Sequence, residues 1–502
     1  MIKLTQLFFF LDVGGVERKI VDLMNQLPGA EFDKQLILSH GKGMMAGQMT
    51  AGCEVIVLPE KHKLIALIDL LRDREISHIH TTNENPFFLW AASLADSPVI
   101  INAIEGSIVS PWSHYADVEV CESEAVRRHQ PRPARTEIIG NGIHVPDALP
   151  TRRLSGAAKP VLIEVKRAGK NMQCSLETSF RQLKAATPDM EAWIIGSEGN
   201  DEDGLLYFGK INHVGHFLQH ADFLLNLSTH EASSNAVLEA MAHGVIPIVS
   251  AIGGNKEIVE NGVNGFTIDE HDHGEIVRRI TQILDEFKTN PGEYEKIRLR
   301  AHAFAREYFS RSKMLDQYEK LYRGMLRSPA PHITKHLSAL LNNTQSSSLF
   351  LDIIERYCFH PGAGVEGMSS ISAHEISVPQ YAFIQTILAR ENLKRNNLTV
   401  AEKQINRALQ AWPEAFYTAL TGGQLYKALG DLDKAAHCFR MATKADPEHI
   451  EASFGYLECL LAMEAFAEAE TLAGNILRQL PVNHAMHSTI TVLLQHLEKQ
   501  AR

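Results

Sequence analysis

The sequence predicts an α/β protein built from two parallel-sheet halves, followed by an all-helical C-terminal region. In the first 150 residues, short apolar runs suited to buried strands alternate with amphipathic helical stretches, and the same rhythm starts again near residue 160. Such alternation is typical of a parallel sheet covered by helices on both faces. From residue 379 onward the strand pattern is absent and a 34-residue helical period replaces it.

The first half, residues 1–150, contains seven apolar or β-branched runs that predict strands, and four helical stretches between them. The strands are expected at 4–11, 34–39, 54–58, 77–80, 98–104, 117–121 and 136–140, and the helices at 16–27, 63–73, 86–95 and 124–129.

The second half, residues 151–327, repeats this order. Its strands are expected at 160–165, 191–196, 205–209, 222–228, 245–250 and 265–268. A helix at 235–244 ends at Gly244, and residues 274–327 are predicted to be long helices. We expect the helices around residues 291–327, including the stretch 306–326, to cross back to the first half and to hinge the two. Two Rossmann-like halves in tandem place a ligand cleft at the carboxyl ends of their strands.

Composition narrows the class of protein. The 502 residues carry 60 Asp and Glu against 49 Lys and Arg, a net charge of −11, which argues against nucleic acid as a partner. Six cysteines without a CxxC pair predict reduced thiols and a cytoplasmic location. No run approaches the roughly 20 apolar residues of a membrane span, although peripheral contact with the inner membrane face stays open.

The C-terminal region, residues 379–502, carries the helical repeat. Proline recurs every 34 residues, and small residues recur in phase with it: Pro379, Pro413, Pro447 and Pro481, with Ala401, Ala435 and Ala469. This pattern resembles tetratricopeptide repeats, which implies a short superhelix with a concave face that binds a protein partner. The alternative is that the repeats only dimerise or stiffen the protein. Residues 328–378 are expected to be a linker with one helix near 349–359.

The most informative stretch begins at His230-Glu231 and continues through Glu239-Ala-Met-Ala-His-Gly244 to Gly253-Gly254-Asn-Lys-Glu257. Glu231 ends the loop after a strand, and Glu239 lies in the helix that follows. The backbone amides of Ser233, Ser234 and Asn235 are expected at the start of this helix, where free donors and partial positive charge suit a phosphate. Eight residues separate the two carboxylates by at most about 12 Å, which suits the headgroup of a nucleotide-diphosphate-sugar.

This string resembles the retaining glycosyltransferases of the GT-B fold, CAZy family four. Gly14-Gly15-Val-Glu17-Arg18 after the first strand is similar to the family's N-terminal glycine loop, and Asn141-Gly142-Ile143 is similar to its turn between the two halves.

The resemblance implies a role for each matching residue. Gly14 and Gly15 let the backbone approach the diphosphate, while Arg167 and Lys170 neutralise it and act as electrostatic catalysts, with Lys166 as a competitor for the first role. Glu239 is implied to hold the ribose and Glu231 the donor sugar. Glu105 stands where the family often has a histidine.

The implied reaction is transfer of a hexose, with retention of configuration, from a UDP- or GDP-sugar. The acceptor is a polysaccharide, a lipid-linked sugar or a protein, and neither a metal nor another cofactor is expected. One alternative is a catalytically weak GT-B scaffold whose repeats mediate protein interaction, and another is a sugar phosphorylase on the same fold.

Three other features have weaker interpretations. Asp201-Glu202-Asp203 is expected to be a solvated acidic turn rather than a metal site. His78 and His80 lack partner ligands at zinc-site spacing, and a structural role is at least as well supported as ligand contact. The basic run from Arg127 to Arg135 could face an anionic acceptor or lipid headgroups, although such a run is usually a solvated loop.

Overall fold

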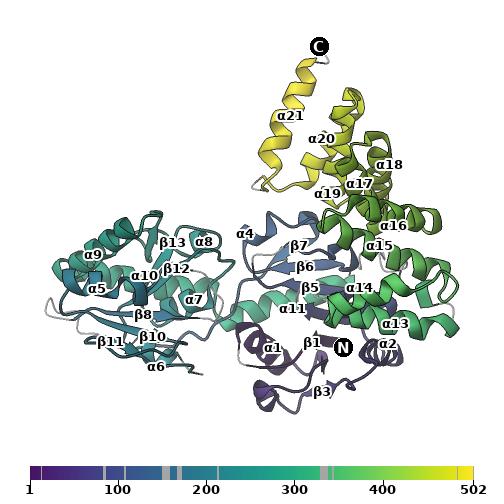
Figure 1. Cartoon of the computed structure of the whole chain (residues 1–502). Helices are drawn as coiled ribbons and strands as arrows, with labels where there is room; N and C mark the ends of the chain where they lie inside the picture. Colours follow the sequence, from purple (N-terminus) through teal and green to yellow (C-terminus); the bar gives the residue numbers. More distant parts are fainter. Residues whose placement is uncertain are drawn as a thin grey trace.

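The computed structural model describes residues 1–12, 14–82, 86–106, 109–149, 159–166, 172–211, 214–327, 337, 339–341, 344–482 and 484–500. Figure 1 shows two lobes side by side, each with a sheet between helices, and a helical region that rises from the first lobe. This is the predicted fold class, an α/β pair of lobes followed by an all-α repeat region.

The first lobe contains one parallel sheet in the order β3-β2-β1-β4-β5-β6-β7. The order reverses direction between β1 and β4, so the carboxyl ends of these strands border a crevice. The strands are β1 (Ile2–Phe8), β2 (Phe32–Leu38), β3 (Cys53–Val57), β4 (His78–Thr82), β5 (Ile100–Ile104), β6 (Val118–Cys121) and β7 (Thr136–Ile138). The helices of this lobe are α1 (Gly15–Gln26), α2 (Lys63–Asp73), α3 (Pro86–Leu94) and α4 (Glu124–Arg127).

Alternating residues of these strands supply two separate cores. Leu4 and Leu36 pack with α1 on one face, whereas Leu7 and Ile37 pack with α2 and α3 on the other. This alternation follows from the two-residue period of a strand, and it requires helices on both faces.

The second lobe has a parallel sheet in the order β11-β10-β8-β12-β13-β14. The short strand β9 pairs antiparallel with β12 and was not expected from the sequence. The strands are β8 (Val161–Val165), β9 (Met172–Cys174), β10 (Glu191–Ile195), β11 (Leu205–Tyr207), β12 (Phe223–Ser228), β13 (Ile246–Ser250) and β14 (Phe266–Ile268). The helices are α5 (Leu176–Ala186), α6 (Gly215–Leu218), α7 (Asn235–Ala242), α8 (Asn255–Ile258), α9 (His273–Thr289) and α10 (Pro291–Tyr308).

Two chain crossings join the lobes. Ile143 forms a parallel bridge with Ser310, and its amide donates to the carbonyl of Phe309 at 2.9 Å. After this point α11 (Arg311–Arg327) returns to the first lobe, where Tyr318 and Tyr322 are fully buried in the core under α1. The predicted return of residues 291–327 to the first half is therefore confirmed for α11, whereas α10 packs in the cores of the second lobe.

The remaining helices continue the core of the first lobe on the side of α2 and α3. They are α13 (Thr344–Phe359), α14 (Pro361–Ser370), α15 (Val378–Lys394), α16 (Leu398–Ala411), α17 (Phe416–Leu429), α18 (Leu432–Ala445), α19 (Ile450–Ala462), α20 (Phe466–Gln479) and α21 (His487–Gln500). From α15 they form antiparallel pairs, as the 34-residue period predicts. Small residues stand where helices cross, since a Cβ on Gly423 or on Gly455 would lie 2.6 Å from the ring of Phe439.

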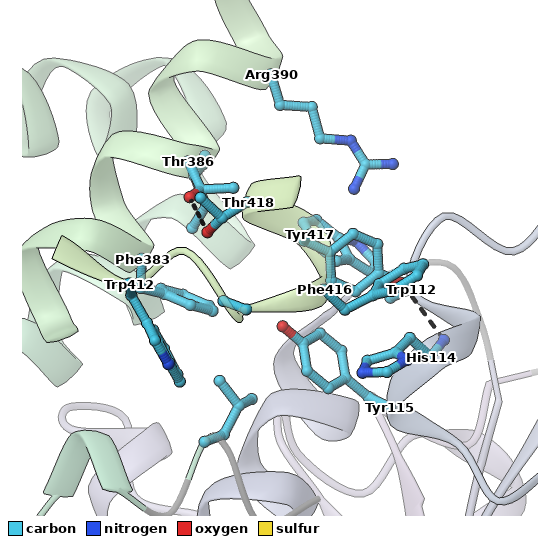
Figure 2. A pocket seen from close by; sticks show the side chains of 13 residues that line it. Trp112, His114, Tyr115, Phe383, Thr386, Arg390, Trp412, Phe416, Tyr417 and Thr418 are labelled. Carbon is cyan, nitrogen blue, oxygen red and sulfur yellow. Dashed lines mark hydrogen bonds between the residues drawn. The ribbon is translucent and has the colours of Figure 1, made fainter. Parts of the chain in front are cut away.

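Two helices of the repeat, α15 and α17, contact the first lobe. Figure 2 shows the junction, where Trp112, His114 and Tyr115 of the first lobe meet Arg390 of α15 and Tyr417 of α17. The guanidinium of Arg390 stacks on Trp112 at 4.5 Å from the ring centre.

A buried charge network closes this junction. Arg132 is fully buried, and its Nε lies 3.2 Å from a carboxylate oxygen of Asp446 in the turn before α19. The same oxygen of Asp446 lies 2.9 Å from Nδ1 of His114, and Arg135 pairs with Glu448. The expectation that the basic run 127–135 is a solvated loop or faces an external anion is therefore wrong at its centre, because the repeats bury Arg132.

Among the described residues, no helix is long and apolar enough to cross a membrane.

Candidate functional site

The loop between β12 and α7 carries the predicted donor-binding residues. Ser234 is the N-cap of α7, and its hydroxyl accepts a hydrogen bond from the Asn226 amide at 2.7 Å. Glu231 accepts from the hydroxyl of Ser228, the last residue of β12, at 3.2 Å. Strand β12 therefore fixes both ends of this loop, and the amides at the start of α7 keep the orientation that suits an anion.

The glycine loop of the first lobe lies directly on the start of α7. A Cβ built on Gly15 would lie 2.2 Å from Nδ2 of Asn235, a separation that no real side chain could adopt without displacing its neighbour. A Cβ on Gly14 would lie equally close to the carboxylate of Glu17. The fold thus brings the predicted glycine loop next to the predicted backbone amides at the start of α7, although 220 residues separate Gly15 from Asn235 in the sequence.

Arg18 and Glu239 face each other across the same cleft. Nη1 of Arg18 lies 3.5 Å from Oε1 of Glu239, and the two side chains are 43% and 27% exposed. Burial raises the pKa of Glu239, and the positive charge of Arg18 opposes this shift. Glu239 is therefore a partly buried acceptor at the contact between the lobes, which is the chemistry needed to hold a pair of sugar hydroxyls.

Apolar and backbone contacts complete the closure. Ala232, next to Glu231, packs with Ile104, Cys121 and Val126 of the first lobe in a small separate core. Within the second lobe, the loop that carries Ala232 packs against the Gly253-Gly254 turn. A Cβ on Gly254 would lie 1.7 Å from the carbonyl oxygen of Ala232.

Sequence reasoning missed a buried charge cluster behind the glycine loop. Lys19 forms an ion pair with Glu105, and its Nζ also lies 3.3 Å from Oδ1 of Asn141. The amide of Asn141 donates to Glu122 at 2.6 Å. Lys19 stays cationic because the nearby carboxylates raise its pKa more than burial lowers it, while burial raises the pKa of Glu122 to about 7.

Within this cluster, Glu105 is the ion-pair partner of the buried Lys19. Glu105 directly follows β5, and its partner Lys19 directly follows Arg18, the residue that meets Glu239. The sequence singled out Glu105 as a departure from the family pattern, but nothing in the local sequence paired it with Lys19.

The predicted basic residues Arg167 and Lys170 lie outside the described residues, so their placement stays a prediction. Lys166, the competing candidate, is described and forms an ion pair with Glu177 at the start of α5. Since Lys166 already has a carboxylate partner, the structure offers no support for a diphosphate role of this residue.

The weaker motifs have structural roles. His80 is buried, and its Nδ1 lies 2.7 Å from the hydroxyl of Tyr322, so this histidine joins β4 to α11. Burial lowers the pKa of His80 to about 3. Asp201 accepts from the amide of Tyr207 at 2.9 Å, and Glu202 pairs with Arg181 on the surface. In the part of the chain that the structure describes, no three His, Cys, Asp or Glu residues are grouped to hold a metal.

Comparisons with known proteins relate parts of the chain to known families. Residues 157–298 match the family model "Glycosyl transferases group 1", and residues 426–493 match "Tetratricopeptide repeat". The chain is 34% identical over 128 residues to N-acetyl-alpha-D-glucosaminyl L-malate synthase of Bacillus anthracis, covering 25% of this chain and 32% of that protein. It is 22% identical over 337 residues to UDP-Gal:alpha-D-GlcNAc-diphosphoundecaprenol alpha-1,3-galactosyltransferase of Escherichia coli, covering 55% of this chain and 86% of that one.

Among solved structures, the complex of Anabaena Alr3699/HepE with UDP has a TM-score of 0.51 and 16% identity, and the match covers 64% of this chain and all of that one. The two lobes with their facing strand ends therefore have the GT-B fold. The similarity to group 1 glycosyl transferases lies in the second lobe, at residues 157–298, and the similarity to tetratricopeptide repeats lies at residues 426–493.

Proposed function

We propose that this protein transfers a hexose, with retention of anomeric configuration, from a UDP-sugar to an acceptor. The observation that carries the proposal is the meeting of Gly15 with Asn235 and of Arg18 with Glu239, because it brings the donor-site motifs of both lobes to one place. The group 1 match supports a nucleotide-sugar donor. The structural relative in complex with UDP and the relative named for UDP-Gal favour UDP over GDP.

In the proposed complex, the amides of Ser233, Ser234 and Asn235 and the backbone at Gly14 and Gly15 surround the diphosphate. Glu239 accepts from the ribose hydroxyls and Glu231 from the hydroxyls of the sugar. As the glycosidic bond breaks, negative charge grows on the diphosphate, where the start of α7 with Arg167 and Lys170 stabilises it. No nucleophile from the protein is needed in this scheme.

For the acceptor, a polysaccharide, a lipid-linked sugar and a protein are the candidate classes. One alignment, which spans 86% of the relative, is with an enzyme named for a diphosphoundecaprenol acceptor, so a lipid-linked sugar is the first class to test.

The test is a transfer assay with radiolabelled UDP-glucose, UDP-galactose and UDP-N-acetylglucosamine against the three acceptor classes. The anomeric configuration of the product is read by NMR. A labelled product with the donor's configuration supports the proposal, and an inverted product contradicts the retaining mechanism. If wild type binds a protein partner but no UDP-sugar, the chain is a GT-B scaffold instead.

A further inference from the structure

A second contact between the lobes lies beside the donor site, at the short helix α4. The carboxylate of Glu257, in α8 of the second lobe, accepts hydrogen bonds from two consecutive amides of the first lobe. Oε2 accepts from the amide of Glu124 at 2.9 Å, and Oε1 accepts from the amide of Ala125. Each carboxylate oxygen thus has its own donor, which fixes the orientation of the side chain as well as the separation of the lobes.

The turn that carries Glu257 is tightly joined to the loop that carries Glu231. The amide of Gly254 donates to the carbonyl of Glu231 at 3.1 Å, and Gly253 has a φ of 46°, which glycine adopts readily. A Cβ on Gly253 would lie 2.0 Å from the same carbonyl oxygen, so no larger residue could keep this approach. This packing couples the position of Glu257 to that of Glu231.

On the other side, α4 is held by the repeats. The carbonyl of Arg128, the residue after α4, accepts from the amide of Ala485 at 3.4 Å, and the carbonyl of Pro131 accepts from the amide of Ile450 at 2.7 Å. The buried pair of Arg132 with Asp446 follows directly. The segment of α4 therefore lies between the second lobe and the repeats, and it contacts both.

We propose that Glu257 is a positioning residue, which acts by holding the loop of Glu231 closed against α4 while the repeats brace α4 from behind. This inference rests on the proposed function for its consequence, the placement of Glu231 at the donor sugar. The contact itself is independent of that function. Removing the carboxylate frees two amides of α4 and lets the lobes separate.

The experiment compares the full-length wild type with Glu257→Ala and Glu257→Gln. The matched control is Glu260→Ala. Glu260 is exposed and lies three residues after Glu257, so this substitution removes the same charge nearby. Small-angle scattering measures the radius of gyration of each variant without ligand and with UDP. Calorimetry measures the affinity for UDP, and a melting curve shows that each variant is folded.

We expect a larger radius of gyration for ligand-free Glu257→Ala than for wild type, and a loss of UDP affinity of about tenfold or more. UDP should return its radius towards the wild-type value. Glu257→Gln keeps one acceptor oxygen and should lie between the two, while Glu260→Ala should match wild type.

If folded Glu257→Ala has the radius and the UDP affinity of wild type, the inference is overturned. If the lobes open in Glu257→Ala but wild type itself binds no UDP, the positioning contact stands and the proposed donor is the part that fails.

Discussion

Nη1 of Arg18, in the first lobe, lies 3.5 Å from Oε1 of Glu239 in the second, so the implied ribose carboxylate already has a cationic neighbour across the cleft. This pairing ties the ionisation of Glu239 to the separation of the lobes. Burial raises the pKa of Glu239 and Arg18 lowers it, so opening the cleft removes the influence of Arg18.

A pH dependence of nucleotide binding follows from this arrangement. The ionised carboxylate is the better acceptor for ribose hydroxyls, so UDP affinity should rise with pH as Glu239 loses its proton. Because the pKa of Glu239 is raised, this rise should lie above the normal range of a glutamate. Calorimetry between pH 4.5 and pH 8 with wild type and Glu239→Gln checks this, and the same slope in both would contradict it.

The glycine at position 15 can be tested by a double substitution. Gly15→Ala should weaken UDP binding by about tenfold, because its methyl group would meet the Asn235 side chain and hold the lobes apart. Asn235→Ala removes that side chain but keeps the backbone amide. The pair Gly15→Ala with Asn235→Ala should therefore recover most of the lost affinity, whereas simple additivity would rule out the steric explanation.

Much of this site could be predicted from the sequence. The interval between Glu231 and Glu239, and the glycines at 14 and 15, are local patterns whose geometry follows from a strand, a loop and a helix start. The ion pair of Lys19 with Glu105 could not be predicted, because it joins two elements through the tertiary fold alone. Arg167 and Lys170 stay predictions from resemblance.

The sequence predicts the fold less well where tertiary contacts decide whether a glycine lies in a helix or whether a charged side chain is buried. The segment 361–370 contains three glycines and lies in the predicted linker 328–378, outside the one helix expected there, yet it forms α14. Gly364 explains the difference, since a Cβ there would lie 2.3 Å from the Cα of Tyr357, and the glycine allows α13 and α14 to pack closely. Arg132 was likewise misjudged because its partner Asp446 is 314 residues away.

We expect the contact between the repeats and the first lobe to contribute to the free energy of unfolding of the whole protein. Asp446→Ala removes the carboxylate between Arg132 and His114 and leaves the buried guanidinium with less compensation. We expect it to lower the free energy of unfolding by about 3–5 kcal/mol, measured by urea denaturation.

The control for this experiment is Glu458→Ala, which breaks an exposed pair with Lys427 and should cost about 1 kcal/mol or less. Equal effects of the two substitutions would show that the buried network does not join the repeats to the lobe.

Buried glutamate also predicts how stability depends on pH. Glu164 is 1% exposed, and burial raises its pKa to about 7 from 4.5. A raised pKa means that the folded state favours the protonated form, so this stabilisation is fully present below pH 4.5 and is lost as the pH rises through about 7.

Glu164→Gln has no proton to lose. Its stability relative to wild type should therefore increase by up to about 3 kcal/mol between pH 4.5 and pH 8, measured by urea denaturation at each pH. A difference that stays constant across this range would contradict the shifted pKa.

Calorimetric binding of UDP to wild type and to Glu239→Ala tests the central claim most directly, with GDP and ADP as comparison ligands. The account predicts that wild type binds UDP in preference to the other two, and that Glu239→Ala loses at least about tenfold in affinity while its melting temperature is unchanged. If wild type binds none of the three at millimolar concentration, or if Glu239→Ala binds UDP as tightly as wild type, the cleft between the lobes is not the proposed donor site.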